Sequence, residues 1–286
     1  MTPRELLVRW LRRQLSPEAM TWLEKSLAQL RTSGKDADLY MAVSLAARKA
    51  GKADLALSEA DVRDAQAARA GWDPRGWSAD QAARVALLLS LDNDPGRLSR
   101  CLDQLCITAD VSELAAFYRG LPLYPDPPRY LARATEGLRT NMKNVFEAIA
   151  HRNPYPSEQF PEAAWNQMVL KAVFIGLALW PIANLDRRAN AALARMLRDY
   201  AHERWAAGRP VSPELWRCVG PHANQAMLQD LEKVLGQGTE PERKAAALAL
   251  HASRDPAAAA LLRHSPELAR AAAAGELNWQ NLAITA

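Results

Sequence analysis

The residues most able to do chemistry are concentrated in one stretch, NLDRRANAALARMLRDYAHERWAAGR. On the helix predicted there, Arg204 falls on the apolar side, so it must extend to solvent or find an acidic or aromatic partner. Asp186 in the preceding turn is the nearest candidate partner. An Asp186–Arg204 pair would lock two helices together. Arg187 and Arg188 in the same turn offer a second chemistry, because guanidinium groups bind phosphates and carboxylates through paired hydrogen bonds.

A second polar group follows the period of a helix between residues 140 and 151. Asn144, Glu147 and His151 fall on one stripe of that helix, opposite an apolar stripe. This stripe lacks the arginine and lysine that are common elsewhere in the chain. It is therefore either a solvent-facing surface or the polar wall of a groove.

The segment 163–179 is apolar nearly all round, which predicts a central buried helix. Lys171 is the only charged residue between Glu162 and Asp186. It either extends its ammonium group to solvent along the one polar edge or lines a mostly apolar pocket, where it could bind an anionic group. Asn166 lies among the apolar positions of the same helix. The candidate groove or ligand-binding residues are thus Asn144, Glu147, His151, Asn166, Lys171, Arg187 and Arg188.

Motifs of known catalytic and metal sites are absent. The sequence has no phosphate-binding glycine loop, no Gly-x-Ser-x-Gly and no Cys/His cluster at metal-ligand spacing. Its three cysteines cannot all pair, which is typical of reduced thiols in a cytoplasmic protein. We therefore predict no catalytic set, no metal ion and no cofactor.

The elements that position these residues are all predicted to be helices. Capping signals such as TPRE, SPEAM, DVSE and SPELW recur along the chain, and strand signals are sparse. The fold class is therefore all-α, a multi-helix antiparallel stack that is either HEAT-like or an irregular α-solenoid. The proline-rich segment 120–130 divides it into helical parts 1–120 and 121–286, or lies within one continuous domain. A second such segment, 151–162, is expected to be an extended loop.

Charge and hydropathy limit the classes of partner that we expect. The net charge of +4 comes from basic residues interleaved with acids, so we expect no nucleic-acid partner. The longest uncharged stretch, 172–185, is too short to span a bilayer. Residues 1–14 form an amphipathic helix with Trp10 on one side and several arginines near the other. That helix either packs on the body of the protein or makes a peripheral membrane contact. We expect a cytoplasmic protein, membrane-associated in the second case.

Two adjacent stretches carry a family resemblance. NVFEAIAHRNPYPSEQFPEAAWNQMVLKAVFIG and LDRRANAALARMLRDYAHERWAAGRPVSPELWRCVGP resemble the core of the EboA family, over about residues 141–220. Proteins of this family accompany a small bacterial and algal gene cluster whose other members resemble a prenyltransferase, a metal-dependent hydrolase, a cyclase and a sugar isomerase. The resemblance carries over no catalytic residue.

The resemblance implies a role in making or exporting a specialised, prenylated metabolite. We expect a non-catalytic accessory or binding protein, whose partners are other proteins of the cluster, a lipid-like small molecule, or both. A helical stack suits this role because it provides an extended surface or an apolar groove. The alternative is an enzyme of the same pathway, with a site built from Lys171, His151 and the turn Asp186–Arg188.

Overall fold

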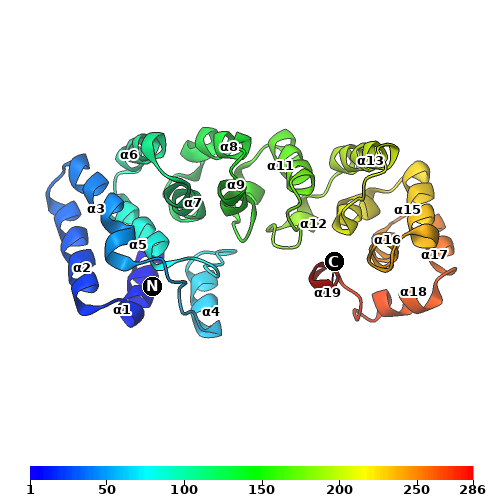
Figure 1. Ribbon diagram of the computed structural model, residues 1–286, viewed down its shortest axis with the longest axis horizontal. Coiled ribbons are helices and arrows are strands. Elements are labelled where there is room, and N and C mark those ends of the chain that lie inside the picture. The colour runs from blue at the N-terminus through cyan, green and yellow to red at the C-terminus, as the bar shows by residue number, and fades with distance from the viewer. Residues whose placement is uncertain (286) are drawn as a thin grey trace. The chain divides into compact units, whose positions relative to one another are not determined.

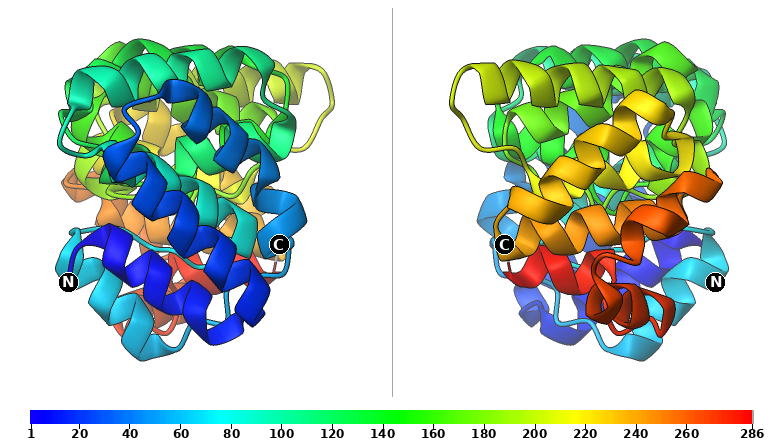
Figure 2. Two further views of the ribbon diagram at one scale, coloured as in Figure 1. Left: turned by 90° about the vertical axis from the view of Figure 1, so that its left-hand side faces the viewer. Right: turned by 90° about the vertical axis from the view of Figure 1, so that its right-hand side faces the viewer.

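The computed structural model describes the backbone of residues 1–285 and the side chains of residues 1–282. The chain is 73% helical, and the described residues contain no strand, so the predicted all-α helical stack is confirmed. Consecutive helices joined by short turns pack side by side, as α2 and α3 do and as α15 and α16 do (Figures 1 and 2). A regular HEAT-like repeat stays a prediction.

Capping explains where many of the helices begin. The Thr2 hydroxyl accepts a hydrogen bond from the Glu5 N–H, and the Glu5 carboxylate accepts one from the Thr2 N–H. Asp110 and Glu113 form the same reciprocal box. These bonds satisfy N–H groups that have no partner within the helix. Ser212 differs, because its side chain makes no cap bond and a 3₁₀ turn, η4, comes between it and the next α-helix.

The chain folds into two compact units, residues 1–160 and 161–286. The boundary falls in the second proline-rich segment. The first one, 120–130, lies inside unit 1, where buried Tyr124 and Tyr130 pack with ring centroids 5.5 Å apart. The division into 1–120 and 121–286 stays a prediction about folding domains.

The second proline-rich segment is not the extended loop expected from its prolines. Residues Tyr155–Gln159 form the one-turn helix α10. Pro154 and Pro156 stand at its start, where a missing N–H costs no helical hydrogen bond. The buried Asn153 fixes the entry, since its Oδ1 accepts from Tyr155 N–H at 3.0 Å and its Nδ2 donates to two carbonyls.

Unit 1 is built around α5, whose residues are nearly all buried. This helix packs against α1, α3 and α7, and α7 in turn packs against α9 (Figure 1). The helices of the unit are α1 (Pro3–Gln14), α2 (Pro17–Thr32), α3 (Asp36–Ala50), α4 (Glu59–Ala68), α5 (Ala79–Leu88), α6 (Pro95–Thr108), α7 (Val111–Arg119), α8 (Leu131–Arg139), α9 (Lys143–Ala150) and α10, with 3₁₀ turns η1 (Leu89–Leu91), η2 (Leu121–Leu123) and η3 (Pro127–Tyr130).

The amphipathic helix α1 packs on the body of unit 1. Leu6, Leu7, Trp10 and Leu11 are each at most 1% exposed. The apolar face that a membrane contact through residues 1–14 requires is therefore already covered by the protein. No helix in the described part of the chain combines the length and apolar character needed to cross a bilayer.

Unit 2 is built around α16. Residues 245–250 of this helix are all buried, and it packs against α14, α15, α17, α18 and α19. The helices of the unit are α11 (Glu162–Phe174), α12 (Leu185–Arg188), α13 (Ala191–Ala206), α14 (Trp216–Val219), α15 (Gln225–Gln237), α16 (Glu240–Ala252), α17 (Pro256–Leu262), α18 (Pro266–Ala273) and α19 (Trp279–Thr285), with 3₁₀ turns η4 (Pro213–Leu215) and η5 (Gly220–His222).

The prediction that segment 163–179 is the central helix is wrong. Helix α11 ends at Phe174, whose side chain is 71% exposed, and the chain turns at Gly176 with a φ of +68°. The helix packs mainly against α13. An apolar composition marks a helix as largely buried, but the number of neighbours that cover it depends on the rest of the fold.

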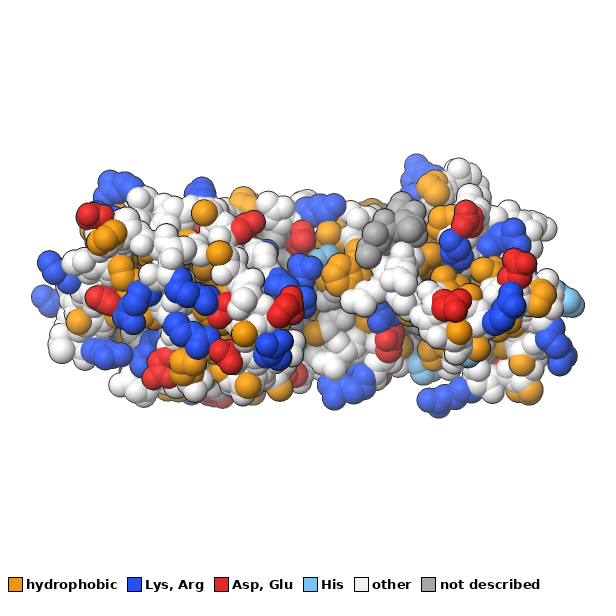
Figure 3. All heavy atoms as spheres, turned by 90° about the horizontal axis from the view of Figure 1, so that it is seen from below, with side chains coloured by type: hydrophobic (Ala, Val, Ile, Leu, Met, Phe, Trp, Pro, Cys, Tyr) orange, Lys and Arg blue, Asp and Glu red, His pale blue; other side chains and the backbone are white. Residues whose placement is uncertain are grey.

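Charges of both signs are mixed on one face of unit 1. On the face of unit 1 at the left of Figure 3, Lys and Arg side chains are interspersed with Asp and Glu. A face of mixed charge does not present the extended positive field that attracts the phosphate backbone of a nucleic acid.

Candidate binding grooves of the first unit

Two adjoining polar hollows lie among α5, α7 and α9. The larger, about 400 Å³, is lined by Gln81 of α5, Arg119 of α7, and Asn144 and Glu147 of α9, among others. The smaller shares Arg119 and Glu147 with it and adds His151 and its neighbours. Together these hollows form what we call the polar groove.

Three of the predicted site residues line this groove together. Their spacing along α9 and its end puts Asn144, Glu147 and His151 on one stripe, while Phe146 and Ile149 on the opposite stripe are fully buried. His151 is the C-cap residue of α9. Its Nδ1 lies 3.6 Å from a Glu147 carboxylate oxygen, so the groove holds an acid and an imidazole side by side.

Arg119, at the end of α7, is one of the lining residues that the sequence did not single out. Its Nη1 donates to the Gly76 carbonyl and, at 3.0 Å, to the Gln81 side-chain oxygen. The same oxygen accepts from the Ser78 N–H, which fixes the Gln81 side chain. Burial lowers the pKa of Arg119, while the nearby Glu147 carboxylate opposes that shift. A basic residue in a last helical turn is too common to have marked this one as a site.

Two more arginines line the smaller hollow. Arg75 donates from Nε and Nη2 to the Asp73 carboxylate at 2.8 and 2.7 Å, and Arg152 Nε lies 3.5 Å from the same carboxylate. Both guanidinium groups therefore share one acid.

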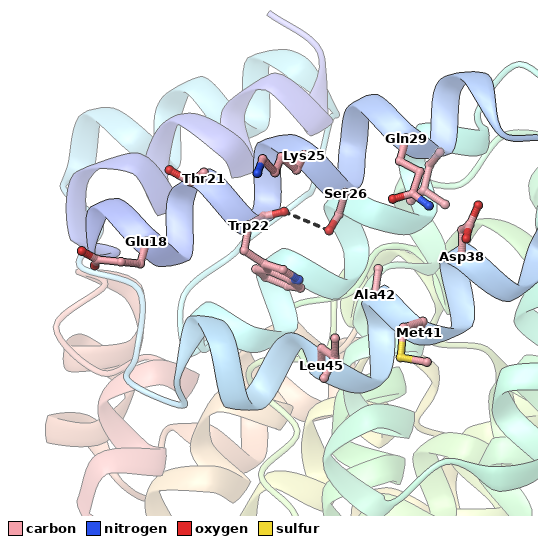
Figure 4. Close-up of a pocket in the computed structure, with 11 residues that line it drawn as sticks. Glu18, Thr21, Trp22, Lys25, Ser26, Gln29, Asp38, Met41, Ala42 and Leu45 are labelled. Carbon is pink, nitrogen blue, oxygen red and sulfur yellow. Dashed lines mark hydrogen bonds between the residues drawn. The ribbon is translucent and has the colours of Figure 1, made fainter.

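Two open hollows flank α3 on the same unit. One, of about 430 Å³, lies between α2 and α3, with the Trp22 ring between Ser26 and Leu45 in Figure 4. The other, of about 550 Å³, lies between α3 and α6 and includes Tyr40. Met41 lines both hollows and is 62% exposed. Both hollows have more apolar linings than the polar groove, and neither contains a predicted site residue.

The other predicted residues lie in unit 2. Asn166 is buried and exchanges two side-chain hydrogen bonds with Asn190, at 3.2 and 2.9 Å. The Arg188 guanidinium lies over the Trp165 ring, 4.8 Å from its centroid. These contacts join α11 to α12 and to the start of α13. Lys171 is half-buried on α11, and Arg187 is exposed.

The predicted Asp186–Arg204 lock is wrong. Asp186 accepts two hydrogen bonds from Arg217, at 2.6 and 2.7 Å, and Arg204 Nε donates to the Pro210 carbonyl at 3.0 Å. Arg204 stands near the far end of α13, which carries it several helical turns from the 186–188 turn. The chain then returns through η4, so that α14 packs on α12 and supplies Arg217.

His202 is exposed, as the helical period of α13 predicts. Its Nε2 also lies 2.9 Å from Asp230 of α15, which accepts from Arg198 Nε at 2.6 Å. Asp230 is 8% exposed. No group of three or more His, Cys, Asp and Glu residues in the described chain is arranged to hold a metal ion.

Comparison with known proteins identifies the family. The family model described as "Metabolite traffic protein EboA" matches residues 3–220, which extends the resemblance from the 141–220 core to nearly the N-terminus. No curated protein and no solved structure matches the chain. The matched range contains every residue that lines the polar groove. The chain therefore belongs to the EboA family of metabolite traffic proteins.

Proposed function

We propose that this protein binds a small metabolite in the polar groove of unit 1 and takes part in its transport without converting it to another molecule. The proposal rests on the polar groove itself. Its larger hollow of about 400 Å³ has the size of a small-molecule site. Three helices supply its polar side chains, so the site is rigid and specific in its hydrogen bonding.

The groove suits a molecule with a polar end and an apolar part. Arg119, Gln81, Asn144 and Glu147 offer donors and acceptors, and the remaining lining includes Val111 and Ala115. A prenylated or otherwise lipid-like metabolite, as the family's gene neighbourhood implies, has this character. In this proposal the protein passes its ligand to other proteins of the cluster.

The test is native mass spectrometry of protein purified from its own host. We expect a small molecule that co-purifies with the wild type and is lost in Ser112→Trp, because the indole would occupy the larger polar hollow. Ser44→Trp is the matched control, since Ser44 lines the hollow between α3 and α6. Absence of any ligand in the wild type, or loss in the control variant alone, would contradict the proposal.

One observation favours a catalytic alternative. The His151–Glu147 pair lies in the groove at 3.6 Å and could transfer a proton to or from a bound molecule. The other elements of the enzyme hypothesis, Lys171 and residues 186–188, belong to unit 2, whereas His151 belongs to unit 1. Conversion of the co-purified ligand to a product of different mass, abolished in His151→Ala, would favour an enzyme over a binding protein.

A further inference from the structure

We infer that the polar groove binds an anionic group of its ligand, a carboxylate or a phosphate, on the Nε–Nη2 edge of Arg119. The inference rests on the proposed function and adds the chemical class of the ligand. It depends on which hydrogen bonds of Arg119 the protein already uses.

One edge of the Arg119 guanidinium is hydrogen-bonded to the protein, and the other edge is not. Both bonds to the protein, to Gly76 and Gln81, come from Nη1. Among the described residues, Nε and Nη2 have no hydrogen-bond acceptor and no carboxylate within 4.0 Å, and neither atom is sealed from solvent. An accessible Nε–Nη2 edge therefore remains in the groove.

This edge is shaped for two oxygens of one anion. Its parallel N–H groups match the spacing of carboxylate or phosphate oxygens, which gives a bidentate, charge-assisted pair. The two Nη1 bonds hold the guanidinium in place before any ligand arrives, so little side-chain entropy is lost on binding. Burial already disfavours the charge of Arg119, and an anion would compensate for the lost hydration.

The neighbouring acids do not occupy the Nε–Nη2 edge of Arg119. Glu147 is the nearest acid to consider, but its carboxylate lies 3.6 Å from His151 and forms no ion pair with Arg119. Arg75 and Arg152 share the single carboxylate of Asp73 at the smaller hollow. The Nε–Nη2 edge of Arg119 therefore has no carboxylate of the described residues paired with it.

The experiment follows the Arg119 Nε–H signal by NMR while inorganic phosphate or acetate is added to the full-length protein, with chloride at equal ionic strength as reference. We expect a saturable chemical-shift change with phosphate, acetate or both. The anion that binds more tightly shows whether the site prefers a phosphate or a carboxylate. Arg119→Lys identifies the signal by its loss and should weaken binding, followed at the remaining groove signals, by about tenfold or more. Arg48→Lys, at an exposed arginine of α3, should leave binding unchanged. No saturable response to either anion, or equal affinity in Arg119→Lys, would overturn the inference.

A gain-of-binding variant keeps the test decisive if Arg119→Lys folds poorly. Glu147→Gln removes the nearest negative charge and should tighten anion binding by about threefold. Unchanged or weaker binding in this variant would count against the site. The two proposals fail separately: a metabolite that stays bound in Arg119→Lys refutes only the anion site, whereas anion binding without a co-purifying metabolite refutes only the proposed function.

Discussion

At Asp230 one buried carboxylate is shared by two side chains of α13. Arg198 donates to it at 2.6 Å and His202 Nε2 lies at 2.9 Å. Arg204, on the same helix, instead donates to a backbone carbonyl at an exposed helix end. The contribution of an arginine to stability here should therefore depend on the burial of its partner.

We predict that Arg198→Ala lowers the free energy of unfolding by about 1–3 kcal/mol, because it leaves a buried carboxylate under-satisfied. Arg204→Ala should change it by no more than about 0.5 kcal/mol, as for most surface substitutions. Urea denaturation of both variants measures the difference. Equal losses, or a larger loss at Arg204, would show that the burial of the partner does not decide how much these arginines stabilise the fold.

At the scale of residues, the sequence predicts geometry where contacts are local. The period of α9 places Asn144, Glu147 and His151 on one stripe, and all three line the groove. Arg119 was missed because the Gly76 and Gln81 groups that hold it are 43 and 38 residues away along the chain. No local pattern reports such a pairing.

At the scale of elements, η5 approaches α16 closely enough to require glycine. A Cβ on Gly220 would lie 2.3 Å from the Ala249 carbonyl oxygen and 2.7 Å from its Cα. Both are backbone atoms of the central helix, which cannot move aside as a flexible side chain can.

Gly220→Ala should therefore destabilise unit 2 by about 1–3 kcal/mol, the usual range for overpacking. Gly236→Ala is the matched control, because Gly236 lies within α15 where an added Cβ would meet no atom within 4 Å, and alanine there should stabilise by about 0.5–1 kcal/mol. Thermal melts followed by circular dichroism compare the two. A neutral Gly220→Ala would mean that η5 can shift away from α16.

Helix α1 is tied to α4 by a buried acid. Asp61 is 3% exposed and accepts from Trp10 Nε1 at 2.9 Å, Arg13 Nη2 at 2.8 Å and Ser58 N–H at 2.9 Å. Burial by itself would raise the pKa of Asp61, but the hydrogen bonds from Arg13 and Ser58 outweigh it and leave the pKa well below its ordinary value.

Because the pKa of Asp61 is lower in the folded state, the direction in which stability changes with pH can be predicted. Asp61 stabilises the fold fully above its unfolded pKa of about 4, and this contribution is lost as the pH falls through the lower folded pKa. The deficit of Asp61→Asn relative to wild type should thus be largest near neutral pH and shrink below about pH 4. Urea titrations at several pH values measure it; a deficit that stays constant into acid would contradict the role of the charge.

At the scale of the whole molecule, the first 160 residues form one packed unit. Gly137 of α8 closely approaches Tyr118 of α7 and Ile149 of α9, and Asn153 donates to the Tyr118 carbonyl at 3.0 Å. A chain ending at residue 120 would lack these neighbours and expose the buried Phe117 and Tyr118.

We predict that a fragment of residues 1–160 folds cooperatively, while a fragment of residues 1–120 is much less stable or aggregates. Circular dichroism melts and gel filtration of the two fragments provide the measurement. If residues 1–120 melted with the same midpoint as residues 1–160, the division at the first proline-rich segment would be the correct domain boundary.

The sequence by itself determined the all-α class, many helix starts and the family. These features depend on interactions within about one helical turn, or on a contiguous run of residue types. Only the tertiary structure decided that α11 is not central, that Asp186 pairs with Arg217, and that Arg119 joins the stripe of α9 in one groove. The reason is physical: a helix's periodicity fixes which face is apolar, but the neighbours of that face are set by the packing of segments distant in the chain.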